Sequence, residues 1–246
     1  MSAALVTLDA VDLSYHTKRA ETHAIENLNM KVYAGEFVSL VGPSGCGKTT
    51  ALSLIMGLIP PSGGSVWAGG LKMGYMLQRD QLLPWRTVEK NVLLGLEVQR
   101  SLSRESRARA MELLSTYGLG DFARHLPAQL SGGMRQKVAL IRTLATEPEL
   151  LLLDEPFSAL DYQTRLRVAD EVYDIIKREN KTAILVTHDI SEAVSMSDRV
   201  LVFSCRPATV KAEFAIRFPK GLSPLARRNE AGFQDYFQQI WREMDV

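Results

Sequence analysis

This chain of 246 residues has few cysteines, no long apolar run and no marked excess of one charge. Its two cysteines, Cys46 and Cys205, lie far apart in the sequence. We therefore expect no disulfide framework. The low cysteine content fits a protein that works in the reducing cytosol. No apolar run approaches the roughly 20 residues that a membrane-spanning helix needs. Any role at a membrane is therefore expected to depend on a partner.

The balance of charged residues is close to neutral. Lys and Arg number 29 against 28 Asp and Glu, which gives a formal net charge of +1. Because no strong overall field results, neither nucleic acid nor an anionic membrane is an expected partner. Residues 1–4 lack the basic-then-apolar pattern of a secretory leader, so we expect none. The apolar share of 46% is enough for the core of one large α/β domain or two small ones.

One glycine-rich stretch, residues 42–49, carries a recognisable chemical pattern. It follows an apolar, strand-like run at residues 37–41 and precedes a helix-like segment at residues 51–56. Glycine, four residues, glycine, lysine and threonine form the phosphate-binding loop pattern. Glycines let the backbone wrap around phosphate oxygens, and the N–H groups of the loop and of the helix start attract the anion. The stretch predicts a bound nucleoside triphosphate, with Lys48 on the β- and γ-phosphates and the Thr49 hydroxyl on Mg²⁺.

A second pattern follows the apolar residues 150–153, which fit a buried parallel strand. Two carboxylates, Asp154 and Glu155, come directly after this run, and a proline follows them. Because successive strand residues point to opposite faces, the two carboxylates are expected to have different roles. Asp154 suits the shell of a Mg²⁺ ion, and Glu155 suits a water poised for in-line attack on the γ-phosphate.

Four further residues allow both a structural and a functional interpretation. Tyr15, at a strand end, either stacks on an adenine base or is simply a half-buried tyrosine. Gln78, at another strand end, either coordinates a water of Mg²⁺ or is a loop glutamine. Ser131, which precedes two glycines, either binds an anion at a helix start or only caps that helix. His188, after an apolar strand, either contacts the γ-phosphate or makes a local bond.

The order and spacing of these patterns resemble the ATP-binding subunit of ABC transporters over almost the whole chain. Each short motif of that family has a counterpart here: the adenine-stacking residue (Tyr15), the Walker A loop (42–49), the Q-loop (Gln78), the signature motif (130–134), Walker B (150–155), the D-loop (157–161) and the switch histidine (His188). Their joint arrangement favours the functional interpretation of all four residues. The resemblance implies an α/β fold: a P-loop NTPase (RecA-like) core sheet with an N-terminal antiparallel β part and an inserted α-helical subdomain.

The resemblance also implies which residues form the site. Catalytic roles fall to Glu155, His188 and Gln78, and Mg²⁺ ligation to Thr49, Gln78 and Asp154. Two copies are expected to stack head to tail around two ATP molecules. The nucleotide contacts of one copy are Tyr15, Gly42, Pro43, Ser44, Gly45, Cys46, Gly47, Lys48, Thr49 and Thr50, and those reaching the other copy's ATP are Ser131, Gly132, Gly133 and Met134. Met134 stands where the family more often has glutamine, and we expect ATP binding to tolerate it.

The family implies a single ABC ATP-binding domain over residues 1–246. The expected parts are an ATP-binding core (1–86 and 145–205), a helical signature subdomain (87–144) and a C-terminal helical tail (206–246). Residues 87–117 are expected to be helical. Apolar residues at helical spacing after Phe233 predict an amphipathic helix that docks on the body.

The expected partners are a second copy of the chain, a membrane permease and, indirectly, a solute-binding protein, with no nucleic acid. The expected place is the cytoplasmic face of the bacterial inner membrane. Residues 83–85, Met134 and residues 240–241 resemble the importer group for nitrate, sulfonates and taurine, although shared packing features also explain them. A soluble ABC-type ATPase with a regulatory or DNA-repair role is the alternative, but no sustained heptad run typical of repair members is present. The transported solute, the permease and the direction of transport stay open.

Overall fold

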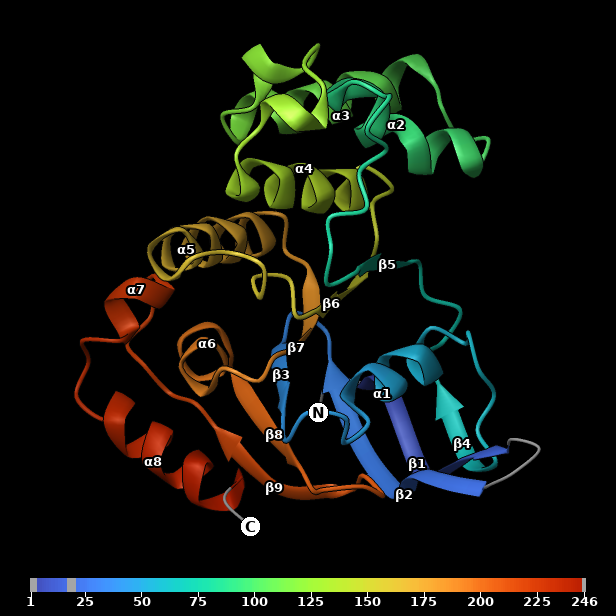
Figure 1. The fold of residues 1–246 in the computed structure, drawn as a ribbon, viewed down its shortest axis with the longest axis vertical. Helices are drawn as coiled ribbons and strands as arrows, with labels where there is room; N and C mark the ends of the chain where they lie inside the picture. Colours follow the sequence, from blue (N-terminus) through green and yellow to red (C-terminus); the bar gives the residue numbers. More distant parts are fainter. Residues whose placement is uncertain (1–3, 17–20, 245–246) are drawn as a thin grey trace. The chain divides into compact units, whose positions relative to one another are not determined.

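The computed structural model describes residues 4–16 and 21–244 (Figure 1). The chain divides into two compact units, one made of Met1–Leu71 and Asn180–Val246 and the other of Lys72–Glu179. The second unit extends beyond the helical segment expected at residues 87–144, because two strands and a further helix pack with it. The first unit contains the predicted phosphate loop, and the second contains the predicted signature motif.

The first unit contains an antiparallel sheet with the strand order β2-β1-β4. β1 (Ala4–His16) pairs with β2 (Glu21–Tyr33) on one side and with β4 (Gly63–Trp67) on the other. Apolar and polar residues alternate through much of residues 5–13, and most of the apolar ones are buried, as expected for a strand with one covered face. The helix after the phosphate loop, α1 (Lys48–Ile55), packs beside this sheet and contacts β4 (Figure 1).

A second set of strands in this unit carries the phosphate loop. β3 (Phe37–Val41) runs parallel to β7 (Thr182–Val186) on one side and to β8 (Arg199–Phe203) on the other. Every residue of β3 and β7 is buried, as expected for parallel strands that are covered on both faces. β9 (Val210–Ala215) pairs antiparallel with β8. The segment expected to be a helical tail from residue 206 therefore begins with a strand.

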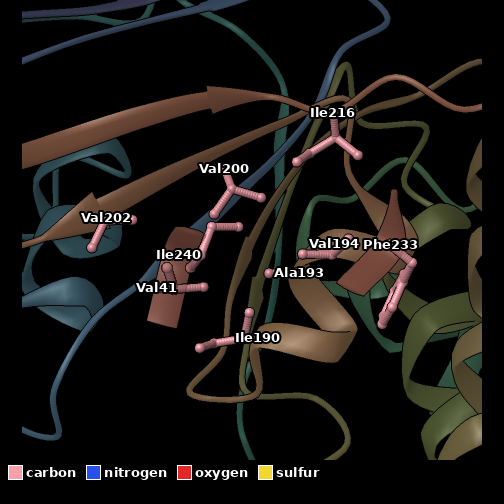
Figure 2. Close-up of a cluster of buried hydrophobic side chains, with 9 residues drawn as sticks. All are labelled: Val41, Ile190, Ala193, Val194, Val200, Val202, Ile216, Phe233 and Ile240. Atoms are coloured by element: carbon pink, nitrogen blue, oxygen red, sulfur yellow. The ribbon is translucent and has the colours of Figure 1, made fainter. Parts of the chain in front are cut away.

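Three helices follow in the same unit: α6 (Ile190–Met196), α7 (Pro224–Arg227) and α8 (Phe233–Met244). Side chains of α6 and α8 meet those of the strands in one apolar cluster (Figure 2), formed by Val41, Ile190, Ala193, Val194, Val200, Val202, Ile216, Phe233 and Ile240. The predicted docking of the terminal helix is confirmed. Because Val41 and Val202 lie near the ends of their strands, the cluster also anchors the start of the phosphate loop and the approach to the β8–β9 turn.

The second unit is mainly helical. Two parallel strands, β5 (Met73–Met76) and β6 (Leu150–Asp154), pair with each other. The helices are α2 (Val88–Val98), α3 (Arg104–Thr116), α4 (Gly132–Leu144) and α5 (Tyr162–Arg178), with short 3-10 turns η1 (Gly120–Phe122) and η2 (Pro127–Gln129). α4 packs against α2, α3 and α5 and so forms the centre of the unit (Figure 1). No helix within residues 4–16 and 21–244 has the length and apolar character of a membrane span.

The expectation of continuous helix at residues 87–117 was wrong at one point. The helix α2 ends at Val98 and α3 begins only at Arg104. Ser103 caps α3, because its hydroxyl accepts the N–H of Ser106 (3.1 Å) while its own N–H donates to the Ser106 hydroxyl (2.8 Å). This reciprocal pair starts a new helix where the apolar periodicity alone gave no break.

Candidate active site

The predicted phosphate loop lies in the first unit, between β3 and α1. β3 ends at Val41, residues 42–47 form the loop, and α1 begins at Lys48. Gly45 and Gly47 have φ values of +73° and +128°, which residues with side chains rarely adopt. Gly47 caps α1 without a side-chain hydrogen bond, so the first N–H groups of the helix face outward from its start. These groups and the helix dipole favour a bound anion.

The side chain of Lys48 is buried within its own loop, with an exposed fraction of 5%. Its Nζ donates to the carbonyl oxygens of Gly42 (2.8 Å) and Pro43 (2.9 Å), and it lies 3.7 Å from Cys46 Sγ. Burial of an ammonium is costly unless its N–H donors find acceptors, and here the loop backbone supplies them. The loop therefore holds a positive charge in its centre, which suits a phosphate ligand.

The other predicted nucleotide contacts of this unit differ in exposure. Ser44 and Thr49 are exposed, whereas Cys46 is buried. Tyr15 lies on β1 opposite Thr22, and its side chain is 44% exposed, which leaves it accessible to a base. The adenine-stacking role of Tyr15 stays a prediction.

His188 follows β7, the parallel neighbour of β3. The N–H of Thr187 donates to the carbonyl of Leu40 (3.2 Å), so the chain leaves β7 at the same sheet end where β3 passes into the phosphate loop. Asp189 then caps α6 by accepting the N–H groups of Ser191 (2.8 Å) and Glu192 (3.2 Å). His188 is exposed in this short, capped turn. Open α/β sheets place ligand-contacting groups at this end of the strands. The γ-phosphate contact of His188 stays a prediction.

In the second unit, Asp154 ends β6 and is buried. The hydroxyl of Tyr75, on the neighbouring strand β5, donates to Asp154 Oδ2 (3.1 Å). Burial raises the pKa of Tyr75, and the negative charge of Asp154 raises it further. Tyr75 is therefore a neutral donor across the physiological range and orients the carboxylate.

Glu155 and Gln78 contact each other in this unit. The amide Nε2 of Gln78 lies 3.3 Å from Glu155 Oε2 and 3.3 Å from the hydroxyl of Ser158, which in turn donates to the Glu155 carbonyl (2.9 Å). Sequence reasoning gave the wrong cause for the different directions of Asp154 and Glu155. Glu155 lies beyond the strand with φ of +45°, so a left-handed residue rather than strand alternation turns its side chain. Such strain in a residue other than glycine is often found at functional sites.

The signature motif begins α4, and Ser131 is the N-cap of that helix. The Ser131 hydroxyl accepts the backbone N–H of Met134 (3.3 Å), a bond that any residue except proline can donate at position 134. The two glycines also have a packing role. A Cβ on Gly133 would lie 2.7 Å from Val168 Cγ2, and one on Gly132 would lie 3.1 Å from Leu160 Cδ2. The motif therefore lets α4 approach α5 closely in addition to presenting backbone N–H groups.

The residues predicted for catalysis and Mg²⁺ divide between the two units. Thr49 and His188 belong to the first, whereas Gln78, Asp154 and Glu155 belong to the second. Sequence reasoning missed the role of Tyr75, although a hydroxyl in an otherwise apolar strand beside the acidic strand end was a usable indication.

Replacing Tyr75 with phenylalanine is expected to raise the Mg²⁺ concentration for half-maximal ATP hydrolysis about threefold to tenfold. The Asp154 carboxylate then loses the hydrogen bond from Tyr75, and a hydrogen bond to a charged acceptor contributes about 1.5–3 kcal/mol. Water replaces part of this contribution. A Mg²⁺ titration of the hydrolysis rate at saturating ATP measures this. Tyr117→Phe is the matched control, since the Tyr117 hydroxyl donates to Glu179 (2.9 Å) and burial raises its pKa to about 12. Equal Mg²⁺ dependence of the two variants would contradict the role of Tyr75.

Comparison with known proteins connects these residues to one family. A family model described as "ABC transporter" matches residues 25–158. The chain therefore belongs to the ABC transporter family. It is the ATP-binding subunit of an ABC transporter and an ATPase whose substrate is ATP with Mg²⁺.

Individual relatives agree with this assignment. An uncharacterized ABC transporter ATP-binding protein, YtlC of Bacillus subtilis (strain 168), is 48% identical over 97% of this chain and 95% of its own length. The nitrate import ATP-binding protein NrtD of Synechocystis sp. is 41% identical over 86% and 83%. The aliphatic sulfonates import ATP-binding protein SsuB 1 of Rhodococcus jostii is 43% identical over 81% and 80%.

A solved structure supports the fold. The dimeric post-hydrolysis structure of the ATP-binding cassette MJ0796, bound to ADP and Pi, has a TM-score of 0.73 and a sequence identity of 32%. It covers 87% of this chain and 100% of its own. The family and the fold class predicted from the sequence are confirmed.

Proposed function

We propose that this subunit powers the import of a small solute of the nitrate, sulfonate or taurine type through a membrane permease. The main observation in support of this proposal is the sequence identity to subunits named for nitrate import (41%) and aliphatic sulfonate import (43%). Each alignment covers more than three quarters of the chain. The subunit then works at the cytoplasmic face of the membrane, and a solute-binding protein delivers the solute to the permease.

The working form in this proposal is a homodimer. Each phosphate loop faces Ser131, Gly132, Gly133 and Met134 of the second copy, with one ATP between them. The dimeric state of the MJ0796 cassette supports this arrangement. Ser131, at the start of α4, is exposed and carries a hydroxyl. Together with the first N–H groups of the helix, this hydroxyl is suited to bind a γ-phosphate. Hydrolysis removes the bridging phosphate and separates the copies, and this motion drives the permease.

The residues of one copy then divide the chemistry. Lys48 and the N–H groups at the start of α1 bind phosphate oxygens. Glu155 accepts the proton of the attacking water, and Gln78, which contacts Glu155, orients that water. His188 contacts the γ-phosphate, which is the group that changes during the reaction.

The predicted Mg²⁺ ligands are chemically suitable. Thr49 offers a hydroxyl, Gln78 an amide oxygen and Asp154 a carboxylate, and all are the hard oxygen donors that Mg²⁺ prefers. The Tyr75 hydroxyl fixes the orientation of the buried Asp154 carboxylate, as expected for a metal site with ordered surroundings. When bound, the ion neutralises charge on the β- and γ-phosphates.

The permease contact in this proposal lies beyond Gln78, at residues 83–86. Trp85 in this stretch is 73% exposed. The stretch is nonetheless fixed, because the buried Asn91 accepts the N–H of Leu83 (2.7 Å) and donates to the carbonyls of Leu83 (3.1 Å) and Arg86 (2.9 Å). A large apolar side chain on a rigid support is typical of an interface anchor.

The experiment is co-expression with the permease encoded beside this subunit, followed by uptake assays with nitrate and an alkanesulfonate in vesicles. We expect ATP-dependent uptake of one anion class, and none with Glu155→Gln. Trp85→Ala is expected to reduce co-purification with the permease at least about tenfold, as for an interface anchor.

Trp67→Ala and Trp241→Ala are the matched controls, since both residues are also exposed tryptophans, at 54% and 51%. These variants are expected to co-purify with the permease as the unaltered protein does. A subunit that never associates with a permease, and whose hydrolysis responds to DNA instead, would overturn the proposal in favour of the soluble ATPase.

A further inference from the structure

The turn between β8 and β9, residues 204–209, packs against the phosphate loop. Three loop glycines mark the contact, because a Cβ on each would meet this part of the chain. A Cβ added to Gly42 would lie 2.9 Å from the carbonyl oxygen of Phe203. One added to Gly45 would lie 3.6 Å from Arg206 Nη2, and one added to Gly47 would lie 3.1 Å from Ala208 Cβ. The loop therefore packs against the end of β8 at Gly42 and against the β8–β9 turn at Gly45 and Gly47.

One side chain of that turn bonds directly to the loop. Nη2 of Arg206 donates to the carbonyl oxygen of Gly45 at 2.7 Å. The N–H of the same peptide group, which belongs to Cys46, donates to the carbonyl of Pro43 at 3.3 Å. In a planar trans peptide the C=O and N–H point in opposite directions. The Gly45–Cys46 peptide is therefore held from both sides, and the bond from Arg206 is the charge-assisted one.

The support for Arg206 is itself fixed. Ser204 closes the turn, because its hydroxyl accepts the N–H of Thr209 (3.0 Å) and donates to the carbonyl of Pro207 (3.1 Å). Ala208 bonds to β2, donating to the Ala24 carbonyl (2.9 Å) and accepting the Glu26 N–H (3.0 Å). Upstream, Val202 is part of the apolar cluster that also contains Val41 (Figure 2). The strand before the loop and the strand before the turn thus share one core.

We propose that Arg206 is a positioning residue for ATP binding. Its guanidinium holds the Gly45 carbonyl outward, so that the N–H groups of the loop are already arranged for the phosphates before ATP arrives. It acts through Gly45 rather than by touching the nucleotide. Preorganisation of this kind raises affinity because less conformational freedom is lost on binding. The inference rests on the assignment of residues 42–49 as the phosphate loop.

The test uses the full chain and three substitutions, with Lys48→Met as a fourth that checks the premise. Arg206→Met keeps the apolar stem and removes the donors, whereas Arg206→Lys keeps one charged donor. Arg217→Met is the matched control, because Arg217 is an exposed arginine just after β9, at the opposite end of the β8–β9 hairpin from the turn. Binding of a fluorescent ATP analogue, hydrogen exchange of the amides of residues 44–48 without nucleotide, and thermal unfolding are measured for each.

For Arg206→Met we expect an ATP dissociation constant about fivefold higher, which is about 1 kcal/mol, and loop exchange that is faster by a similar factor. The KM for ATP rises with it, kcat changes less than about twofold, and the unfolding temperature stays the same. Arg206→Lys lies between Arg206→Met and the unaltered protein, and Arg217→Met matches the unaltered protein.

Three results overturn the proposal. The first is an unchanged ATP affinity in Arg206→Met, which would show that Arg206 has no role in binding. The second is an equal loss of ATP affinity in Arg217→Met, which would show a general effect of charge. The third is weaker ATP binding by Arg206→Met with unchanged amide exchange in the loop, which would indicate that Arg206 contacts ATP directly. If Arg206→Met fails to fold, Arg206→Lys decides instead. Unchanged ATP affinity and unchanged loop exchange in Arg206→Lys overturn the proposal, whereas a higher dissociation constant together with faster loop exchange supports it. Lys48→Met tests the premise that residues 42–49 bind the phosphates. If Lys48→Met binds ATP normally, the assignment of the phosphate loop itself is wrong, whatever the Arg206 variants show.

Discussion

Replacing Glu155 with glutamine is expected to lower ATP hydrolysis at least about a hundredfold, because a positioned general base contributes about 10²–10⁴-fold to such a reaction. The substitution keeps the size of the side chain and its ability to accept a hydrogen bond from Gln78, but the amide takes no proton from water. ATP affinity is expected to stay within about twofold, since Glu155 acts on the water and not on the nucleotide. Steady-state phosphate release and binding of labelled ATP measure the two effects.

The same variant tests the homodimer. If ATP joins two copies and hydrolysis separates them, a protein that binds ATP without cleaving it is expected to accumulate as a dimer. Light scattering with Mg²⁺ and ATP then reports twice the mass of the chain. Loss of turnover without a dimer would support Glu155 as the base and contradict the ATP sandwich.

Glu147→Gln is the matched control for this variant. Glu147 also has a left-handed backbone, with φ of +53° against +45° for Glu155, and it is exposed just before the same strand. The control is expected to hydrolyse ATP at the unaltered rate. An unaltered rate in Glu155→Gln would refute Glu155 as the essential carboxylate.

Replacing Lys48 with methionine is expected to weaken ATP binding about a hundredfold. Each hydrogen bond to a charged group contributes about 1.5–3 kcal/mol, and 1.4 kcal/mol is a factor of ten, so the loss of two phosphate contacts has this size. Calorimetric titration with Mg²⁺-ATP measures the change. ADP binding is expected to weaken as well, because the β-phosphate is present in both nucleotides.

The fold is expected to survive the Lys48 substitution. The buried ammonium bonds only to loop carbonyls and to Cys46 among the contacts described above, and methionine fills a similar volume without a charge to bury. Thermal unfolding without nucleotide checks this. Lys220→Met, at an exposed position, is the matched control and should bind ATP normally. Normal binding by Lys48→Met would contradict the assignment of the phosphate loop.

Much of the core of this protein could be predicted from its sequence, because the relevant patterns are local. The apolar runs at residues 37–41 and 150–153, and the apolar strand predicted before His188, became buried parallel strands. Ser131 caps its helix as expected from Ser followed by glycines. The phosphate loop also lies where the pattern placed it, between a strand and a helix. Each of these features depends on neighbours within a few residues, so the chain order alone contains them.

The places where prediction failed depend on distant neighbours. β9 alternates half-buried and exposed residues and becomes a strand only because β8 offers it a partner. The break between α2 and α3 depends on the backbone bonds of Ser103, which apolar periodicity does not report.

By itself the sequence determined the family, the core strands around the motifs and the chemical types in the site, since motif spacing and hydrophobic period are properties of a single stretch. The tertiary structure alone decided which side chains support those motifs. Tyr75 reaches Asp154 across 79 positions, Gln78 reaches Glu155 across 77, and Arg206 reaches Gly45 across 161. Such contacts arise from the pairing of distant strands, and the spacing of residues within one segment contains no information about them.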